Sequence, residues 1–255
     1  MVDKPELPWY DKRVRQALQM ALDRETIIRD YYTGKAEIFN SPTAAFSTWK
    51  SAGAYIPLEQ LPASARELYK YNPTKAKQLL AEAGYPKGFK MEVITQAATI
   101  DELTIIKEQF AKIGVDVEIQ VKETGVYTSI SRGHTNKHAL YGGTGGTSVF
   151  DWENYRFGSP QNTANVNDAV VNEGIAEFAK YYMLDDAKAY PIIGKFVPYI
   201  VEQSWYIYFP SPYTYTLWWP WVKNFHGEWV IGVAAKWGFT EYIWIDQSLK
   251  KSMGF

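Results

Sequence analysis

The glycine-rich segment from Gly142 to Ser148 contains the first residues whose types and spacing could bind a ligand. It reads Gly-Gly-Thr-Gly-Gly-Thr-Ser. A P-loop would need Lys-Ser or Lys-Thr after its glycines, and a dinucleotide fingerprint would need glycine where Ser148 stands. The segment therefore does not predict nucleotide binding. Glycines permit positive φ angles and a close backbone approach. Because ligands of open α/β sheets bind beyond the carboxyl ends of strands, we expect this turn to line a cleft.

Asp151 and Trp152 follow this turn and form a second candidate for ligand binding. A carboxylate beside an aromatic plane can hold an ammonium group or a sugar hydroxyl. A capped turn with one packed tryptophan explains the same two residues equally well. Both interpretations stay open at the level of the sequence.

The remaining reactive side chains do not predict catalysis or metal binding. The chain has no cysteine, which excludes disulfides, thiolate nucleophiles and thiolate metal sites. His134 and His138 are four residues apart, but Thr135 stands where zinc proteases carry glutamate. The Gly-x-Ser-x-Gly elbow of serine hydrolases is absent, and His226 is the only other histidine. We therefore predict no enzyme activity, no cofactor and no metal.

Helices at the start of the chain are predicted from apolar spacing and capping residues. Apolar residues recur at helical spacing between Asp11 and Asp23. Asp23 is expected to cap a second, short helix. Asn72 is a favourable N-cap, Pro73 suits the first helical position, and Gly84 supplies a left-handed stop.

A strand–helix–strand unit follows. Phe89 to Thr95 is predicted to be a strand, Thr99 and Glu102 to form a capping box, and Val115 to Val121 to alternate as a half-buried strand. Short links make this a right-handed βαβ unit with parallel strands. Further predicted elements are helices at Val126–Arg132 and Val170–Met183, a helix from Asp185 to about Val201 kinked or interrupted at Pro191 and Pro198, and strands at His138–Gly142, Trp205–Phe209 and Tyr213–Trp218.

Charge and hydropathy exclude two classes of partner. Lys and Arg number 27 and Asp and Glu 28, a net charge of −1 without a basic stripe, so nucleic acid is not an expected partner. No stretch near the length of a membrane span is free of charge and proline, so direct membrane insertion is not expected. The first residues lack the apolar region of a secretory signal. Aromatic residues make up 16% of the chain and can fill a core or line a cleft.

Several segments together resemble the bacterial extracellular solute-binding proteins of family 5, which serve ABC importers. These segments are the opening Tyr10-Asp11-x-Arg13-Val14-Arg15-Gln16-Ala17-Leu18 with Ala21-Leu22-Asp23-Arg24, the helix ending Leu79-Leu80-Ala81-Glu82-Ala83-Gly84-Tyr85-Pro86, Lys112-Ile113-Gly114-Val115 before a strand, Glu202-Gln203-Ser204-Trp205 leading to Phe209-Pro210, and Pro220-Trp221-Val222-Lys223-Asn224 with Gly227.

The resemblance implies a two-lobed receptor that closes over its solute, of which this chain would be the C-terminal lobe. Residues 1–212 would form an α/β lobe of the type II periplasmic-binding-protein kind, with a mixed, partly parallel sheet flanked by helices. Residues 213–255 would return to an N-terminal lobe that this chain lacks, as it lacks an export signal. The parent protein would be periplasmic or extracellular and membrane-associated. Its partners would be a peptide or oligosaccharide solute and a membrane ABC permease.

The resemblance also implies a ligand-binding set, and it raises a question about the solute. The set is Tyr127, Gly145, Thr147, Ser148, Asp151 and Trp152. In the family's peptide binders, an aspartate of a Trp-x-x-Asp-Tyr-Pro-Asp-like segment holds the peptide's α-amino group. Alignment by Asn154-Tyr155 places Ser148 at that position. An oligosaccharide, or a different mode of peptide binding, thereby becomes more credible.

Two other functions remain open. A stand-alone carbohydrate-binding module would use Trp152 and the C-terminal aromatic residues as an exposed stacking platform. A hydrolase would need a serine or a pair of carboxylates beside a histidine in a pocket.

Overall fold

The computed structural model describes the chain except for residues 1–2, 41, 136, 143–148 and 228–237. The chain divides into two compact units, Met1–Ser211 and Pro212–Phe255. Each unit is described by itself.

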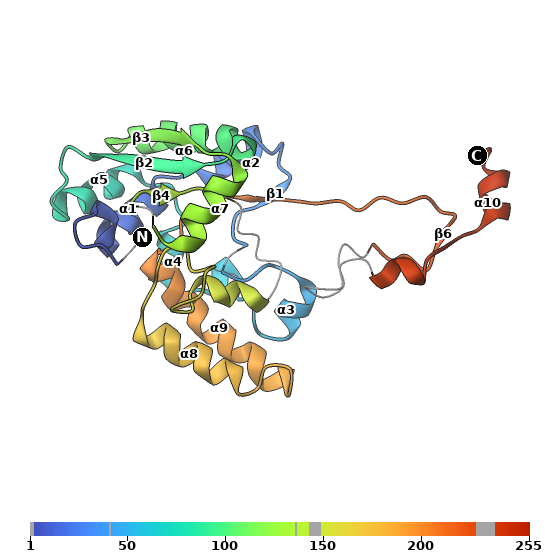
Figure 1. Cartoon of the computed structure of the whole chain (residues 1–255). Helices are drawn as coiled ribbons and strands as arrows, with labels where there is room; N and C mark the ends of the chain where they lie inside the picture. Colours follow the sequence, from blue (N-terminus) through green and yellow to red (C-terminus); the bar gives the residue numbers. More distant parts are fainter. Residues whose placement is uncertain (1–2, 41, 136, 143–148, 228–237) are drawn as a thin grey trace. The chain divides into compact units, whose positions relative to one another are not determined.

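The first unit is an α/β domain (Figure 1). Its helices are α1 (Lys12–Met20), α2 (Arg24–Asp30), α3 (Ser47–Ser51), α4 (Ala63–Glu67), α5 (Pro73–Glu82), α6 (Ile100–Ala111), α7 (Thr124–Gly133), α8 (Ala169–Ala179) and α9 (Asp186–Gln203), with 3-10 turns η1 (Pro8–Tyr10), η2 (Leu58–Gln60), η3 (Ala97–Thr99) and η4 (Val149–Asn154). Its strands are β1 (Ala36–Glu37), β2 (Phe89–Thr95), β3 (Val115–Val121) and β4 (Ala139–Leu140), and β5 (Ser211–Pro212) stands at the boundary of the two units.

The capping residues predicted for two helices are confirmed. The Asn72 side chain accepts a hydrogen bond from Lys75 N at 3.0 Å at the start of α5, and the Asp23 side chain accepts from Thr26 N at 3.1 Å at the start of α2. Gly84 follows α5 with a φ of +95°, in the left-handed region that glycine enters without steric cost.

The central sheet has three parallel strands in the order β3-β2-β4. β2 and β3 pair along their whole length, from Phe89 opposite Val115 to Thr95 opposite Val121. The predicted βαβ unit is therefore present as β2-α6-β3. β4 is short and pairs with β2 only at Val93 and Ile94. Within the described residues, the first four residues of β2 consequently have a strand neighbour on one side only.

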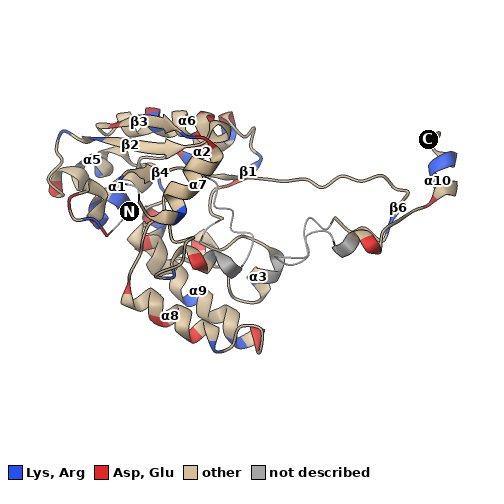
Figure 2. Cartoon of the chain, viewed as in Figure 1, with Lys and Arg blue, Asp and Glu red and all other residues tan. Residues whose placement is uncertain are grey.

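One face of this sheet carries the main hydrophobic core. Met91 and Val93 of β2 and Val115 and Val117 of β3 are buried in one cluster with apolar residues of α1, α5 and α6. The alternate residues of the same strands are largely charged, since strand side chains point to opposite faces in turn. Figure 2 shows acidic and basic residues intermixed along the ribbon of the first unit.

A second core cluster joins α8 and α9 to the segment around η4. It is rich in aromatic residues, and Trp152 and Tyr155 are buried in it beside Ile193. α9 continues as one helix through Pro191 and Pro198, so the prolines do not interrupt it.

Two predicted strands are absent from the described structure. Trp205–Phe209 and Tyr213–Trp218 pair with no neighbouring strand there, and only Ser211–Pro212 is assigned as β5. Pro210 and Pro212 lack the N–H that a ladder requires. The first of these segments contacts the rest of the unit through side chains such as Tyr206, whose Oη donates to Asn154 O at 2.8 Å.

The second unit is small and rich in aromatic residues. β6 (Val222–Lys223) pairs antiparallel with β7 (Trp244–Ile245), and η5 (Gly238–Glu241) and α10 (Gln247–Ser252) complete the unit. Trp219 stacks on Trp221 with ring centroids 4.6 Å apart, and Phe255 lies against both rings. Within the described residues, none of the helices has the length and apolar character needed to cross a bilayer.

Buried tyrosines of the first unit make its stability sensitive to alkaline pH. Burial raises the pKa of Tyr69 to about 12 and that of Tyr206 to about 12. In the unfolded chain these phenols ionise near pH 10. The free energy of unfolding should therefore be unaffected by them below pH 10 and fall as the pH rises from 10 to 12. Urea unfolding followed by circular dichroism at pH 8 to 11.5 measures this. A free energy that stays constant across this range would contradict the prediction.

Candidate functional site

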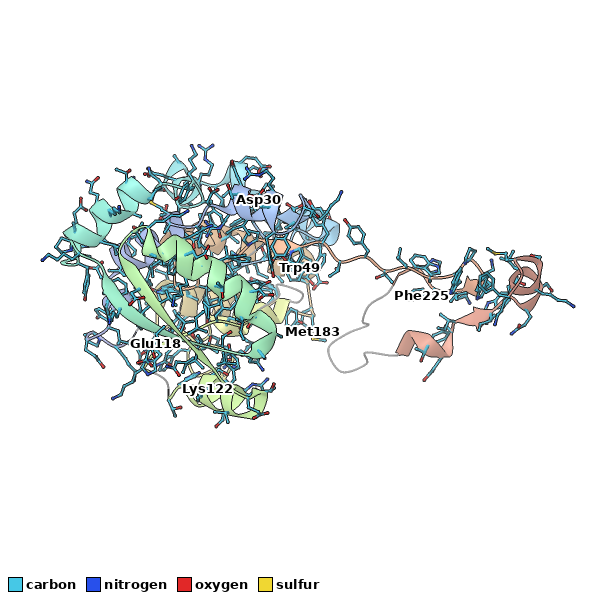
Figure 3. The ribbon with its side chains drawn as sticks, turned by 90° about the horizontal axis from the view of Figure 1, so that it is seen from above. Asp30, Trp49, Glu118, Lys122, Met183 and Phe225 are labelled. Carbon is cyan, nitrogen blue, oxygen red and sulfur yellow. The ribbon has the colours of Figure 1, made fainter. Side chains whose placement is uncertain are left out.

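The sheet order places a topological switch point between β2 and β4. The chain leaves β2 through α6 to reach β3 on one side, and leaves β3 through α7 to reach β4 on the other. In open α/β sheets the crevice outside the carboxyl ends of two such strands is where ligands bind. In Figure 3, Glu118 in β3 and Lys122 just past its end mark the direction in which the parallel strands run towards this edge.

Hydrogen bonds join the carboxyl ends of β2 and β4 at the switch point. Tyr141 N donates to Ile94 O at 2.9 Å, and Thr95 Oγ1 donates to Tyr141 O at 3.0 Å. Thr95 is fully buried, and its Oγ1 shares a hydrogen bond of 2.7 Å with Thr99 Oγ1. The backbone at this edge is thereby held in one arrangement.

Glu102, in the first turn of α6, is bound there by two tyrosines from other elements. Tyr32 Oη, just after α2, donates to its Oε1 at 2.8 Å, and Tyr141 Oη, just after β4, donates to its Oε2 at 2.7 Å. Both tyrosine pKa values are raised, first by burial and then by the hydrogen bond to the carboxylate. The two hydroxyls therefore keep their protons at physiological pH and act as donors.

The predicted capping box of α6 is wrong, and the reason lies in these contacts. Thr99 precedes α6 but its side chain caps no N–H. A capping box would also bring Glu102 back to Thr99 N, which already donates to Gln96 O at 3.1 Å. Both carboxylate oxygens of Glu102 instead accept from the tyrosines. Glu102 thus faces the switch point.

Among the predicted ligand-binding residues that the structure describes, Tyr127 packs against Gly142, the residue after Tyr141. Its side chain, on α7, is half-buried, and burial raises its pKa. A Cβ placed on Gly142 would overlap the Tyr127 hydroxyl and lie 2.9 Å from Cζ. The first glycine of the turn after β4 is therefore needed for Tyr127 to pack there. Gly145, Thr147 and Ser148 lie outside the described residues.

Asp151 and Trp152 stand in η4. The Asp151 side chain is not among those described. Trp152 is 4% exposed, and its ring packs edge-on against Phe196 of α9 with centroids 6.1 Å apart. Its ring thus belongs to the second core cluster.

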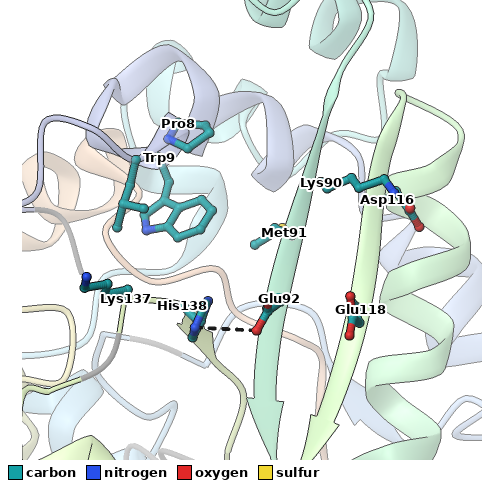
Figure 4. A pocket seen from close by; sticks show the side chains of 10 residues that line it. Pro8, Trp9, Lys90, Met91, Glu92, Asp116, Glu118, Lys137 and His138 are labelled. Carbon is teal, nitrogen blue, oxygen red and sulfur yellow. Dashed lines mark ion pairs between the residues drawn. The ribbon is translucent and has the colours of Figure 1, made fainter.

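A cavity of about 330 Å³ lies at the other end of β2 (Figure 4). It is lined by Leu7, Pro8, Trp9, Lys90, Met91, Glu92, Asp116, Glu118, Lys137 and His138. His138 Nε2 lies 3.5 Å from Glu92 Oε2 across it. The cavity contains none of the predicted ligand-binding residues and is away from the carboxyl ends of the strands. Within the described residues, His, Asp and Glu side chains form no cluster suited to a metal ion.

The residues that meet at the switch point were not singled out as a site from the sequence. Thr95, Glu102 and Tyr141 are separated along the chain, and Tyr32 is 70 residues from Glu102. One signal was available, since Thr95 and Tyr141 are polar residues at or just past the ends of predicted strands. Polar groups at that position are the ones that can reach a ligand in an α/β fold.

Comparison with known proteins gives consistent matches. The family model described as "Bacterial extracellular solute-binding proteins, family 5 Middle" matches residues 4–165. The "Oligopeptide-binding protein AppA" of Bacillus subtilis is 32% identical over 136 residues, which are 48% of this chain and 23% of that protein. The "Heme-binding protein A" of Haemophilus influenzae is 29% identical over 200 residues, 69% of this chain and 34% of that protein.

A solved structure extends the match to nearly the whole chain. The periplasmic binding protein DppA of Helicobacter pylori, in complex with peptide STSA, superimposes with a TM-score of 0.71 and 21% identity over 96% of this chain and 46% of that one. The fold is thus that of a type II periplasmic binding protein. The chain spans less than half the length of each of these three proteins.

Proposed function

Because the chain belongs to the bacterial extracellular solute-binding proteins of family 5, we propose that it forms the solute-binding lobe of an ABC-import receptor. The observation that carries this proposal is the polar arrangement at the switch point. Thr95, Glu102 and Tyr141 meet there at the carboxyl ends of β2 and β4. Such a site binds a solute by hydrogen bonds and needs no reacting groups.

The mechanism proposed is closure over the solute. In a two-lobed receptor, a ligand that contacts both lobes binds the closed arrangement more tightly and so shifts the population towards it. This lobe would supply one wall of the cleft. The parent protein would act in the periplasm or outside the cell, and would pass its solute to a membrane permease.

We propose a peptide as the solute. AppA, which is 32% identical to part of this chain, is named an oligopeptide-binding protein. A peptide presents N–H, C=O and charged ends that match the Tyr141 hydroxyl and the Glu102 carboxylate, both of which belong to half-buried residues. The burial of Trp152 counts against a stand-alone carbohydrate-binding module that stacks a sugar on this ring, although the C-terminal residues Trp218 and Trp219 are exposed.

The 255-residue chain is expected to bind short peptides weakly and at the switch point. One wall of a cleft supplies only part of the contacts, so the dissociation constant for a tetrapeptide should be weaker than about 100 μM. Heteronuclear NMR titration should show the largest shifts at Thr95, Glu102 and Tyr141. Maltotetraose, of similar size and uncharged, is the matched control and should leave these resonances in place.

Two results would overturn this proposal. The first is submicromolar peptide binding by the chain alone, which would show a complete site in one lobe. The second is a peptide titration that shifts no resonance around the ends of β2 and β4.

A further inference from the structure

We propose that Glu102 is the subsite for a positively charged group of the solute, an ammonium or a guanidinium. This inference rests on the proposed function and names the class of solute that the switch point selects. Four features of the described structure support it: the unused acceptor positions of the carboxylate, its charge balance, its aromatic surroundings and its place in the fold.

The carboxylate of Glu102 has acceptor positions to spare. A carboxylate offers about four lone-pair positions on its two oxygens. Tyr32 and Tyr141 each use one of them. Glu102 is half-buried and not fully enclosed, and the proposal places the solute at the remaining positions. The two tyrosines also hold the carboxylate in one orientation before a ligand arrives, which lowers the entropy cost of binding.

The contacts of Glu102 are with neutral groups. Both hydrogen-bond donors are tyrosine hydroxyls, and in the part of the chain that the structure describes no lysine, arginine or histidine forms an ion pair with Glu102. By contrast, two carboxylates near α1 and α2 form ion pairs. Asp11 pairs with Arg13, and Asp30 pairs with Arg29. A half-buried carboxylate without a cation attracts one from a ligand, and a charge-assisted hydrogen bond is the stronger kind.

Aromatic rings lie next to this carboxylate. Tyr31 stands edge-on to Tyr32 with centroids 4.7 Å apart and is 41% exposed. Phe209 contacts both of these rings, at 6.5 and 6.1 Å. Burial first and then the charge of Glu102 raise the pKa of Tyr31, so its hydroxyl lies within electrostatic reach of the carboxylate. An organic cation held by a carboxylate gains further from aromatic faces nearby.

The position of Glu102 matches the place where a solute would lie. It joins the first turn of α6, the helix that follows β2, to Tyr141 just after β4. Its side chain is free to face this edge because Thr99 N is satisfied by Gln96 O. Glu102 does not cap α6 and instead accepts hydrogen bonds from two tyrosines that are distant in the sequence. This places its carboxylate for a ligand.

The test compares probes that differ only in charge. Acetyl-Ala-Arg-Ala-amide carries one guanidinium and no charged end, and acetyl-Ala-citrulline-Ala-amide has nearly the same shape without the charge. Acetyl-arginine amide and acetyl-citrulline amide provide the same pair as single residues. Ala-Ala-Ala-amide places the positive charge on the α-amino group, and acetyl-Ala-Ala-Ala-amide is its neutral partner. Each is titrated by NMR into the 255-residue chain at low salt.

The expected result is a preference of about tenfold for each cationic probe over its neutral partner, the low end of what a charge-assisted hydrogen bond gives. Glu102→Gln retains one oxygen that can accept from a tyrosine, replaces the other oxygen with NH₂ and removes the negative charge. It should therefore abolish the preference for cationic probes. Glu108→Gln, a change of an exposed glutamate on the same helix, should retain it. Raising the salt concentration should reduce the preference in the unchanged chain.

The outcomes separate this inference from the proposed function. If neutral and cationic peptides bind equally at the ends of β2 and β4, the subsite is wrong while the peptide-binding lobe stands. If Glu102→Gln lowers the melting temperature but leaves the preference intact, Glu102 is a structural link only and the inference is overturned. A third outcome is that peptides do not bind, but acetyl-arginine amide shifts the resonances of Glu102 and Tyr141 more than acetyl-citrulline amide does. In that case the subsite stands and the peptide proposal fails. If neither single-residue probe shifts them, the subsite is wrong.

Discussion

Replacement of Gly88 by alanine is expected to lower the free energy of unfolding of the first unit by more than about 3 kcal/mol. Gly88 precedes β2 and has a φ of +76°. A Cβ there would overlap the carbonyl carbon and oxygen of Gly114 and lie 2.8 Å from its Cα. These are backbone atoms at the start of β3, where Phe89 pairs with Val115, so relief of the overlap requires the two strands to separate.

Gly84→Ala is the matched control for this change. Gly84 also has a positive φ, +95°, but nothing lies within 4 Å of a Cβ built on it. Its replacement should cost about 1–2 kcal/mol, the cost of a side chain in the left-handed region. Urea unfolding followed by far-ultraviolet circular dichroism measures both variants. Equal losses for the two would show that the close approach of Gly88 to Gly114 has no energetic effect.

Arg24→Met is expected to cost about 2–4 kcal/mol in the same experiment. Arg24 is 1% exposed and donates to Tyr208 O at 3.2 and 3.1 Å and to Gln19 O at 3.0 Å. Its guanidinium also lies 4.6 Å from the centre of the Tyr69 ring. Methionine fills much of the volume but donates no hydrogen bond, so two buried carbonyl groups lose their donor. Burial lowers the pKa of Arg24 to about 10, which leaves it charged at neutral pH.

Arg13→Met is the control for Arg24. Arg13 lies on α1 with half of its side chain exposed, and it pairs with Asp11. Exposed ion pairs contribute between zero and about 1 kcal/mol, because solvent screens them and side-chain order is lost. A loss for Arg24→Met as small as that for Arg13→Met would mean that removing a charge from the interior offsets the loss of its hydrogen bonds.

The elements that could be predicted from the sequence are those with local causes. Asn72 caps α5 through an N–H three residues away, and Gly84 ends it through its own φ angle. The βαβ unit follows from the apolar alternation of Val115 to Val121 beside a helix of matching length. Each of these signals lies within a few residues, so a single segment contains all of the information.

The site depended on contacts between distant residues, and these could not be predicted. Glu102 has the spacing of a capping residue, but Tyr32 and Tyr141, 70 and 39 residues away, provide better donors. Trp152 is equally compatible with a cleft and a core until α9 brings Phe196 against it. Arg24 looks like a surface charge on a helix, yet the carbonyl of Tyr208, 184 residues later, accepts its hydrogen bonds.

The partial pairing of β2 has a consequence for colloidal behaviour. A strand with free N–H and C=O groups along one side is a template to which another chain can add, and proteins guard such edges with charged side chains and proline. In the described structure the unpaired stretch of β2 carries Lys90 and Glu92, and Pro8 lies beside it in the same cavity. Charged residues and a proline at this edge disfavour the pairing of β2 with a strand of another molecule.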